Sequence, residues 1–263
     1  MANKQKLTQN ELIEKVLAHQ YFLAKDVDGW ENMRADFSNY DLSLVDFTNL
    51  VPEISTVKAP IDLTGAKFDG ADLSHTNFMY AKLDECSFAH TDLTDANLYG
   101  ASCHNASFAE AIVREANFSN VKLFYCTCNG ANFFHTNFYR ASIQNCSFTE
   151  ANLSEVKTVT SLIDCDCTRA LFIRADLENC NLSGSNLSGS NFSYARLTNA
   201  NLVSALMTGG KMSGAQLCGA DLYYAVMVGI DFSHADLSGA NLRTCTFDNC
   251  NLTGAIPGKR VIR

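Results

Sequence analysis

The stretch NLSGSNLSGSNFSYARLTNANL, residues 181–202, places a leucine or phenylalanine at every fifth position. An α-helix repeats near 3.6 residues and a β-strand at 2, so neither keeps these side chains on one face. If the large residue is labelled i, residue i−2 is small throughout the stretch. Residues i−2 and i point to the same side of a short extended segment, but five is odd, so a bend must follow in every repeat.

The five-residue period extends over most of the chain. It holds over residues 37–47, 63–163 and 167–252, which together contain 42 repeats. Every residue i except Thr158 is apolar, and 32 of them are Leu or Phe. Position i−2 carries 22 Ala and 7 Cys, and neither column contains a charged residue. Charged side chains are almost never fully buried without partners, so the two columns predict the interior of a stack of repeats.

Blocks such as ADLSH at 71, ANLYG at 96 and ADLSG at 235 carry a family resemblance. Over roughly residues 35–254 the chain is similar to pentapeptide repeat proteins, whose unit is A(D/N)Lxx. The resemblance implies an all-β solenoid, a right-handed quadrilateral parallel β-helix. It has four repeats per coil, with i and i−2 inside and i−1, i+1 and i+2 outside. About 11 coils at the ~4.8 Å spacing of neighbouring strands predict a rod about 50 Å long.

The two ends of the chain differ. Residues 7–25 predict an α-helix, because Thr8 and Glu11 have the spacing of a capping box and an apolar stripe follows. We expect residues 1–34 to cap the first coil, residues 35–254 to form the β-helix and residues 255–263 to form a tail. Trp30 is expected to help seal the capped end. No such helix follows the last repeat, which leaves a tail folded over it or homodimerisation through the C-terminal coil as alternatives.

Two interruptions are expected in the β-helix. The spacing from Phe47 to Leu63 exceeds three full repeats by one, which predicts a one-residue insertion with a bulge or short loop within residues 50–61. One residue is missing from the frame within residues 161–170, where a kink or changed stacking is expected. Neither interruption predicts a long projecting loop.

No catalytic, cofactor or metal site is predicted. Ten of the eleven cysteines fall at i or i−2 and only Cys218 faces outward, which favours buried thiols used as core filler. The C-x-C pairs at 126–128 and 165–167 lie two coils apart, about 10 Å on the strand spacing, too far to share one zinc ion. The histidines outside the helix fall at i+1 or i+2, where no serine, cysteine or carboxylate forms a recognisable constellation with them.

Two outward features indicate function. Aromatic residues at i+1 or i+2 suggest a partner-binding surface, and the candidates are Tyr99, Phe124, Tyr125, Phe134, Tyr139, Tyr223 and Tyr224. The alternative is that neighbouring corner residues cover one another. Residues 35–255 contain 23 acidic and 12 basic residues, a net charge of −11, which argues against a direct nucleic-acid binder.

These observations predict a non-enzymatic scaffold that binds an unidentified protein partner through a rigid, acidic outer surface. The resemblance offers an alternative, since some pentapeptide repeat proteins imitate DNA and occupy the DNA site of gyrase, as in fluoroquinolone resistance. The modest charge and the expected lack of long loops and of a C-terminal dimerisation helix argue against that alternative. Since neither a signal peptide nor a membrane span is evident, a cytoplasmic protein is expected.

Overall fold

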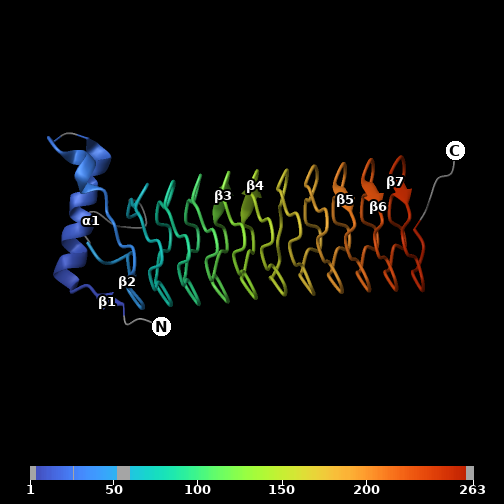
Figure 1. Ribbon diagram of the computed structural model, residues 1–263, viewed down its shortest axis with the longest axis horizontal. Coiled ribbons are helices and arrows are strands. Elements are labelled where there is room, and N and C mark those ends of the chain that lie inside the picture. The colour runs from blue at the N-terminus through green and yellow to red at the C-terminus, as the bar shows by residue number, and fades with distance from the viewer. Residues whose placement is uncertain (1–3, 26, 52–59, 259–263) are drawn as a thin grey trace.

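Each coil of the chain lies against the next, so that a residue pairs with the equivalent residue four repeats later. The computed structural model describes residues 4–25, 27–51 and 60–258. Parallel bridges join Asp62 to Lys82, Lys82 to Ser102 and Ser102 to Lys122. One coil therefore holds four repeats, and the coils stack into the elongated parallel β-helix of Figure 1.

Regular elements are short because a corner interrupts every repeat. The elements are β1 (Gln5–Lys6), α1 (Gln9–Ala24), the 3-10 helix η1 (Trp30–Met33), β2 (Tyr40–Asp41), β3 (Lys122–Phe124), β4 (Ser142–Gln144), β5 (Leu206–Thr208), β6 (Val226–Val228) and β7 (Thr246–Asp248). The two-residue strands β1 and β2 pair in parallel, as do β3 with β4 and, in a further sheet, β5 with β6 and β6 with β7.

The four repeats of a coil form four faces. We name them by residue i of one coil: Leu63 on face 1, Phe68 on face 2, Leu73 on face 3 and Phe78 on face 4. All four side chains are buried, as are nearly all i and i−2 residues from 61 to 242, which confirms the predicted interior. Rings stack between coils, with a centroid distance of 5.0 Å between Phe68 and Phe88. Eight cysteines are buried, two near the C-terminal end are partly buried, and Cys218 is exposed.

The conformation of the corners explains the two glycines in residues 181–202. Residue i+2 adopts the left-handed conformation, with φ of +69° at Gly184 and +67° at Gly189. Glycine reaches this region without strain. Many corners nevertheless carry a larger residue in the same conformation, such as Tyr125 at +59° and His135 at +61°. The corner conformation is therefore imposed by the stacked coils on whichever residue occupies it.

The insertion in the first coil is much longer than predicted. Asp36 pairs with Lys67, Asp41 with Asp72 and Asp46 with Asn77, and each of these spacings exceeds the usual one by eleven. The expected one-residue insertion is therefore wrong, because eleven extra residues lie between faces 4 and 1. The spacing from Phe47 to Leu63 fits one extra residue after three repeats or eleven after one, and the period alone does not distinguish them. Residues 52–59 of this segment lie outside the described part of the chain.

The missing residue lies just before residues 161–170, the range in which it was expected, because the frame has already shifted at Ser161, which pairs with Asn181. Asn137 pairs with Lys157 at the usual spacing, whereas Gln144 pairs with Ile163, one position sooner than the usual spacing. The buried positions shift accordingly, because Val159 and Leu162 enter the core in place of Thr158 and Ile163. This explains the one polar residue at position i, since the Thr158 side chain does not occupy the core.

Helix α1 lies across the N-terminal end of the coils (Figure 1). It begins with the predicted capping box, in which the backbone N–H of Glu11 donates to Thr8 Oγ1 and the Thr8 N–H donates to the Glu11 carboxylate. Its buried side chains are Leu12, Val16 and His19. Trp30 of η1 packs on Phe22 of the helix, with ring centroids 5.7 Å apart.

The C-terminal end of the stack is apolar. Its hollow is lined by Leu237, Leu242, Phe247 and Leu252 among others, and Leu252 is 45% exposed. Residues 259–263, including the tail expected to fold over this end, lie outside the described residues. Within the described ranges, no helix is both long and apolar enough to cross a lipid bilayer.

Candidate functional site

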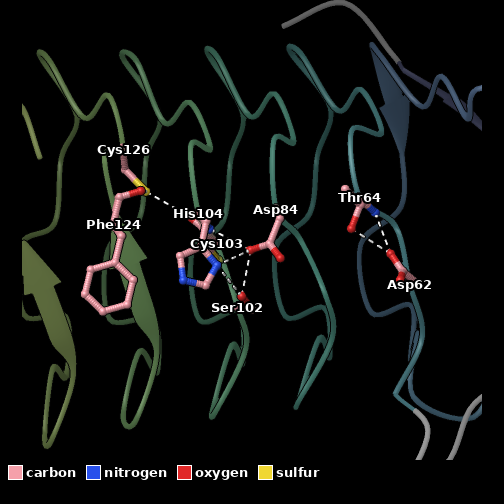
Figure 2. Close-up of polar contacts among 8 residues, drawn as sticks. All are labelled: Asp62, Thr64, Asp84, Ser102, Cys103, His104, Phe124 and Cys126. Atoms are coloured by element: carbon pink, nitrogen blue, oxygen red, sulfur yellow. Dashed lines mark hydrogen bonds and ion pairs between the residues drawn. The ribbon is translucent and has the colours of Figure 1, made fainter. Parts of the chain in front are cut away.

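Outward polar residues at i−1 mostly serve the corners. The Oδ1 atom of Asp62 accepts the backbone N–H of Thr64 at 3.1 Å (Figure 2), and Asp72 does the same for Ser74 at 3.0 Å. This Asx turn recurs wherever a described repeat carries Asp or Asn at i−1. It gives the D/N of the repeat unit a local physical role.

A different arrangement is found at some repeats in which i−1 is serine. Asp84 lies one coil before Ser102 and His104, and its Oδ1 accepts the Ser102 hydroxyl at 2.6 Å and the His104 backbone N–H at 2.7 Å (Figure 2). The Asp84 carboxylate thus replaces the Asx acceptor that Ser102 cannot provide. Asn129 plays the same part for Ser147 and Thr149.

The Asp84, Ser102 and His104 cluster has the composition of a hydrolase triad but not its geometry. Nδ1 of His104 lies 2.9 Å from Asp84 Oδ1 and 2.8 Å from the Ser102 hydroxyl. In a triad the carboxylate and the serine contact different ring nitrogens, so that the imidazole removes the hydroxyl proton. Here the hydroxyl donates to the carboxylate, and Phe124 stacks on the imidazole at 5.0 Å. The cluster therefore stabilises a corner and does not activate a nucleophile.

Sequence reasoning missed this cluster. The sequence pattern indicated no carboxylate partner for the histidines outside the helix, but four of them lie close to a carboxylate in a neighbouring coil. The pairs are His75 with Asp95, His90 with Glu110, His104 with Asp84 and His135 with Glu155. The available signal was the spacing of one full coil, four repeats, between the members of each pair. Among the described residues, no group of three or more His, Cys, Asp or Glu side chains is arranged to hold a metal ion.

The seven candidate aromatic residues do not converge on one surface. Phe124, Tyr125, Tyr223 and Tyr224 follow face 1, but the two pairs lie five coils apart. Tyr99 and Tyr139 follow face 4, and Phe134 follows face 3, at the corner diagonally opposite the first. Several have local partners: Tyr99 packs on Tyr80, Phe134 lies under Arg114 and Tyr139 under Arg140.

Tyr223 and Tyr224 belong to a larger apolar cluster that forms when the coils stack. Strand β5 pairs in register with β6, which places Leu206 beside Val226 on the outside of face 2. Tyr223 and Tyr224 stand at the adjoining corner, with ring centroids 4.3 Å apart. We call this surface the β5–β6 patch, and it consists of Val203, Leu206, Tyr223, Tyr224, Val226 and Val228.

The β5–β6 patch differs from the other outward apolar residues. Ile112 and Leu171 also occupy i−1 and are 42% and 38% exposed, but their neighbours in the adjacent coils are Asp or Asn. Within residues 35–51 and 60–258, consecutive coils both carry an apolar residue at i−1 only at Leu206 and Val226. Clustered exposed apolar residues often mark contact surfaces. The patch is therefore the best candidate for a binding site in the described chain.

Several acidic residues also form hydrogen bonds that stabilise the corners of the coils. Asp41, Asp72 and Asp92 stack on face 3 in consecutive coils, and each accepts the N–H of its own corner. Burial raises the pKa of Asp41, but hydrogen bonds from Ser43 and contact with Lys6 outweigh it, so the pKa lies below its usual value. The Asp41 carboxylate therefore supplies negative charge at neutral pH while it also holds its corner.

Comparison with known proteins agrees with this architecture. The family model described as pentapeptide repeats matches overlapping segments that cover residues 61–155 and 165–256. The unmatched gap, residues 156–164, contains the point at which one residue is missing. A search of curated proteins found no match.

Several solved structures are similar. HetL, a pentapeptide repeat protein involved in heterocyst differentiation regulation in the cyanobacterium Nostoc, is 24% identical; the match covers 84% of this chain and 89% of HetL, with a TM-score of 0.34. QnrB1, a plasmid-mediated fluoroquinolone resistance protein, is 18% identical over 76% of this chain and 92% of its own, with a TM-score of 0.43. A thylakoid-lumen protein of Arabidopsis thaliana is 28% identical over 45% of this chain and 68% of its own, with a TM-score of 0.23.

The family model covers well over half of the chain, and its segments coincide with the stacked coils. The repeat pattern that the family model matches corresponds to the buried residues at i and i−2 and to the Asx turns at i−1. On these grounds the chain belongs to the pentapeptide repeat family.

Proposed function

We propose that the protein is a non-enzymatic scaffold that binds a protein partner, and that the β5–β6 patch is the main contact. The observation that carries the proposal is the pairing of Leu206 with Val226 beside two tyrosines. The patch lies on backbone held by parallel bridges to the coils on both sides. A surface that is already ordered loses little conformational freedom on docking, which favours affinity.

The charge of the rod supports the same function. A net charge of −11 over residues 35–255 attracts a partner with a basic rim and raises the association rate at low salt. The uncharged β5–β6 patch then supplies the short-range contact. These separate roles predict that added salt lowers the association rate constant more than substitutions in the β5–β6 patch lower it.

The test is a comparison of matched lysine substitutions. We expect the double variant Leu206→Lys and Val226→Lys to lose a partner that the wild-type protein captures from its host lysate. Leu171→Lys is the control, because Leu171 is also at i−1 and is 38% exposed, as is Leu206. A partner captured equally by all three proteins would show that the patch is not the contact.

A second function, mimicry of DNA toward gyrase or a related topoisomerase, is favoured by the eleven-residue insertion. The sequence pattern predicted no long loop, which counted against this function. The pairing of Asp46 with Asn77 shows eleven extra residues, so that objection no longer holds. The inferred rod of about 11 coils is about 50 Å long at ~4.8 Å per strand. A DNA segment of that length carries roughly 30 phosphate charges at one per ~1.7 Å, well above 11. Supercoiling that does not respond to excess protein would rule this function out.

We also propose that two copies associate through the apolar C-terminal coil. Leu252 and Ile256 are about half exposed there, and burying such side chains against a second copy is favourable. The test is light scattering at micromolar concentration. A dimeric mass that becomes monomeric in Leu252→Lys supports the proposal, and a monomeric wild-type protein contradicts it.

A further inference from the structure

The most unusual polar group in the described chain is the imidazole of His19. This residue lies in α1 and is fully buried against the first coil. Its Nδ1 accepts the backbone N–H of Ala35 at 3.1 Å, so Nδ1 carries no proton and the ring is neutral. Its Nε2 then carries the proton, and among the described residues it is the buried side-chain nitrogen or oxygen without a hydrogen-bond partner.

The surroundings of His19 compensate a positive charge only in part. Burial lowers the pKa of the imidazole, and this effect outweighs the nearby Asp62 carboxylate and the backbone of Leu63 and Thr64, which favour the charged form. Arg34, which follows η1, adds a repulsive positive charge. The Asp62 carboxylate is already engaged by Thr64 and by Lys82, whose Nζ lies 3.0 Å away.

The other polar contacts between α1 and the first coil do not depend on a group that titrates near neutral pH. Lys15 donates to the carbonyl of Asp36 at 3.1 Å and Gln20 donates to the carbonyl of Asp62 at 3.2 Å. Burial raises the pKa of Asp36 and of Asp62, but hydrogen bonds from the nearby Ser38 and Thr64 outweigh it, so both pKa values lie below normal. Among the described side chains named here, His19 is the one whose ordinary pKa lies between pH 7.5 and 5.0.

We propose that His19 is a pH-sensitive latch: it holds α1 on the first coil while neutral and releases the helix when protonated. A proton on Nδ1 faces the N–H of Ala35, which turns a hydrogen bond into a donor–donor contact. It also places a positive charge at a site that is closed to water and near the positive charge of Arg34. The helix relieves both costs by undocking into water.

The direction and size of the effect follow from linkage. A histidine whose pKa is lowered in the docked state binds more protons in the undocked state. Docking is therefore strongest above the ordinary histidine pKa of about 6.5 and weakens as the pH falls below it. One proton changes the docking equilibrium by at most about tenfold per pH unit, or about 30-fold between pH 6.5 and 5.0.

Undocking changes the surface that the protein presents. Leu12 and Val16 of the helix and the i and i−2 side chains of the first coil lose their cover. Strand β2 also loses its partner β1, which leaves an unpaired strand edge at this end. Open edges and apolar ends promote association, so acidification is expected to expose a second interaction surface far from the β5–β6 patch.

The experiment measures opening of α1 by hydrogen exchange. Protection of residues 9–24, corrected for the intrinsic pH dependence of exchange, is followed from pH 7.5 to 5.0. Residues 181–202 provide an internal reference. In the wild-type protein we expect helix protection to fall by up to about 30-fold between pH 6.5 and 5.0 while the reference is unchanged. Trp30, the single tryptophan, gives a parallel fluorescence signal because it packs on α1.

His19→Asn is the diagnostic variant, because the asparagine oxygen can accept the Ala35 N–H but cannot be protonated. We expect its helix protection to be independent of pH in this range, whereas the exposed control His75→Asn behaves like the wild type. A wild-type helix that stays protected at pH 5.0, or an equal pH response in His19→Asn, overturns the proposal.

If His19→Asn fails to dock the helix at any pH, the wild-type imidazole is titrated directly by NMR. Loss of helix protection that coincides with protonation of His19 supports the latch. Helix amides that remain protected after His19 is protonated refute it.

Discussion

Replacement of Phe192 by alanine is the sharpest test of the packed interior. The Phe192 side chain is 1% exposed, and its ring stacks on Phe172 of the preceding coil at 4.5 Å with an interplanar angle of 3°. A closed ladder surrounds the site: the Phe192 N–H donates to the Lys211 carbonyl and the Asn191 N–H donates to the Ala170 carbonyl. The backbone therefore cannot collapse into the space that the ring leaves.

The expected cost follows from these contacts. Replacement of a buried phenylalanine by alanine typically costs about 3–5 kcal/mol, and loss of a stacked ring pair accounts for about 0.5–1.5 kcal/mol of such a change. Because the cavity cannot close, we expect a value in the upper half of that range, about 4–5 kcal/mol. Stability in a solenoid is carried by contacts between neighbours, so the loss should be concentrated in the coils next to Phe192.

The assay combines urea denaturation with hydrogen exchange of the individual coils. Tyr194→Ala is the matched control, because Tyr194 belongs to the same repeat but is 60% exposed. Substitutions at such surface positions usually change stability by about 0.5 kcal/mol or less. If Phe192→Ala costs less than about 1 kcal/mol, or no more than Tyr194→Ala, the interior on face 3 is not close-packed and the reasoning fails.

Three further outcomes are expected. Asp84→Ala should lower the free energy of unfolding by about 1–2 kcal/mol, because two part-buried donors lose their acceptor. Asp84→Asn should retain most of the wild-type stability, because Asn129 accepts the equivalent hydrogen bond from Ser147. Denaturation midpoints measure both effects. A thiol reagent should modify one cysteine rapidly in the native protein, and Cys218→Ser should abolish that phase, because burial raises the pKa of thiols such as Cys86. Stability should fall as the pH drops below about 4, because carboxyl groups such as Asp231 have lowered pKa values that favour the folded state above that range; an acid titration followed by circular dichroism that shows no loss down to pH 2 contradicts this.

The amino-acid sequence by itself determined which side chains are inside. The rule is local: i−2 and i point the same way in an extended segment, and a corner follows. It therefore predicted the burial of residues as far apart as Leu63 and Leu237, and the outward position of Cys218. The helix with its capping box at Thr8 was predictable for the same reason, since the contacts of the box lie within its first turn.

Only the tertiary structure decided which coils and corners meet. The pattern repeats with every pentapeptide, but a face repeats only with every fourth one, so an interruption leaves the choice of face open. This is why the spacing from Phe47 to Leu63 predicted one extra residue, whereas the pairing of Asp46 with Asn77 shows eleven. The Asp84 cluster, the β5–β6 patch and the contact of His19 with Ala35 join residues that are several repeats apart in sequence. Their formation depends on the stacking of whole coils and of α1, and no local preference of the chain encodes it.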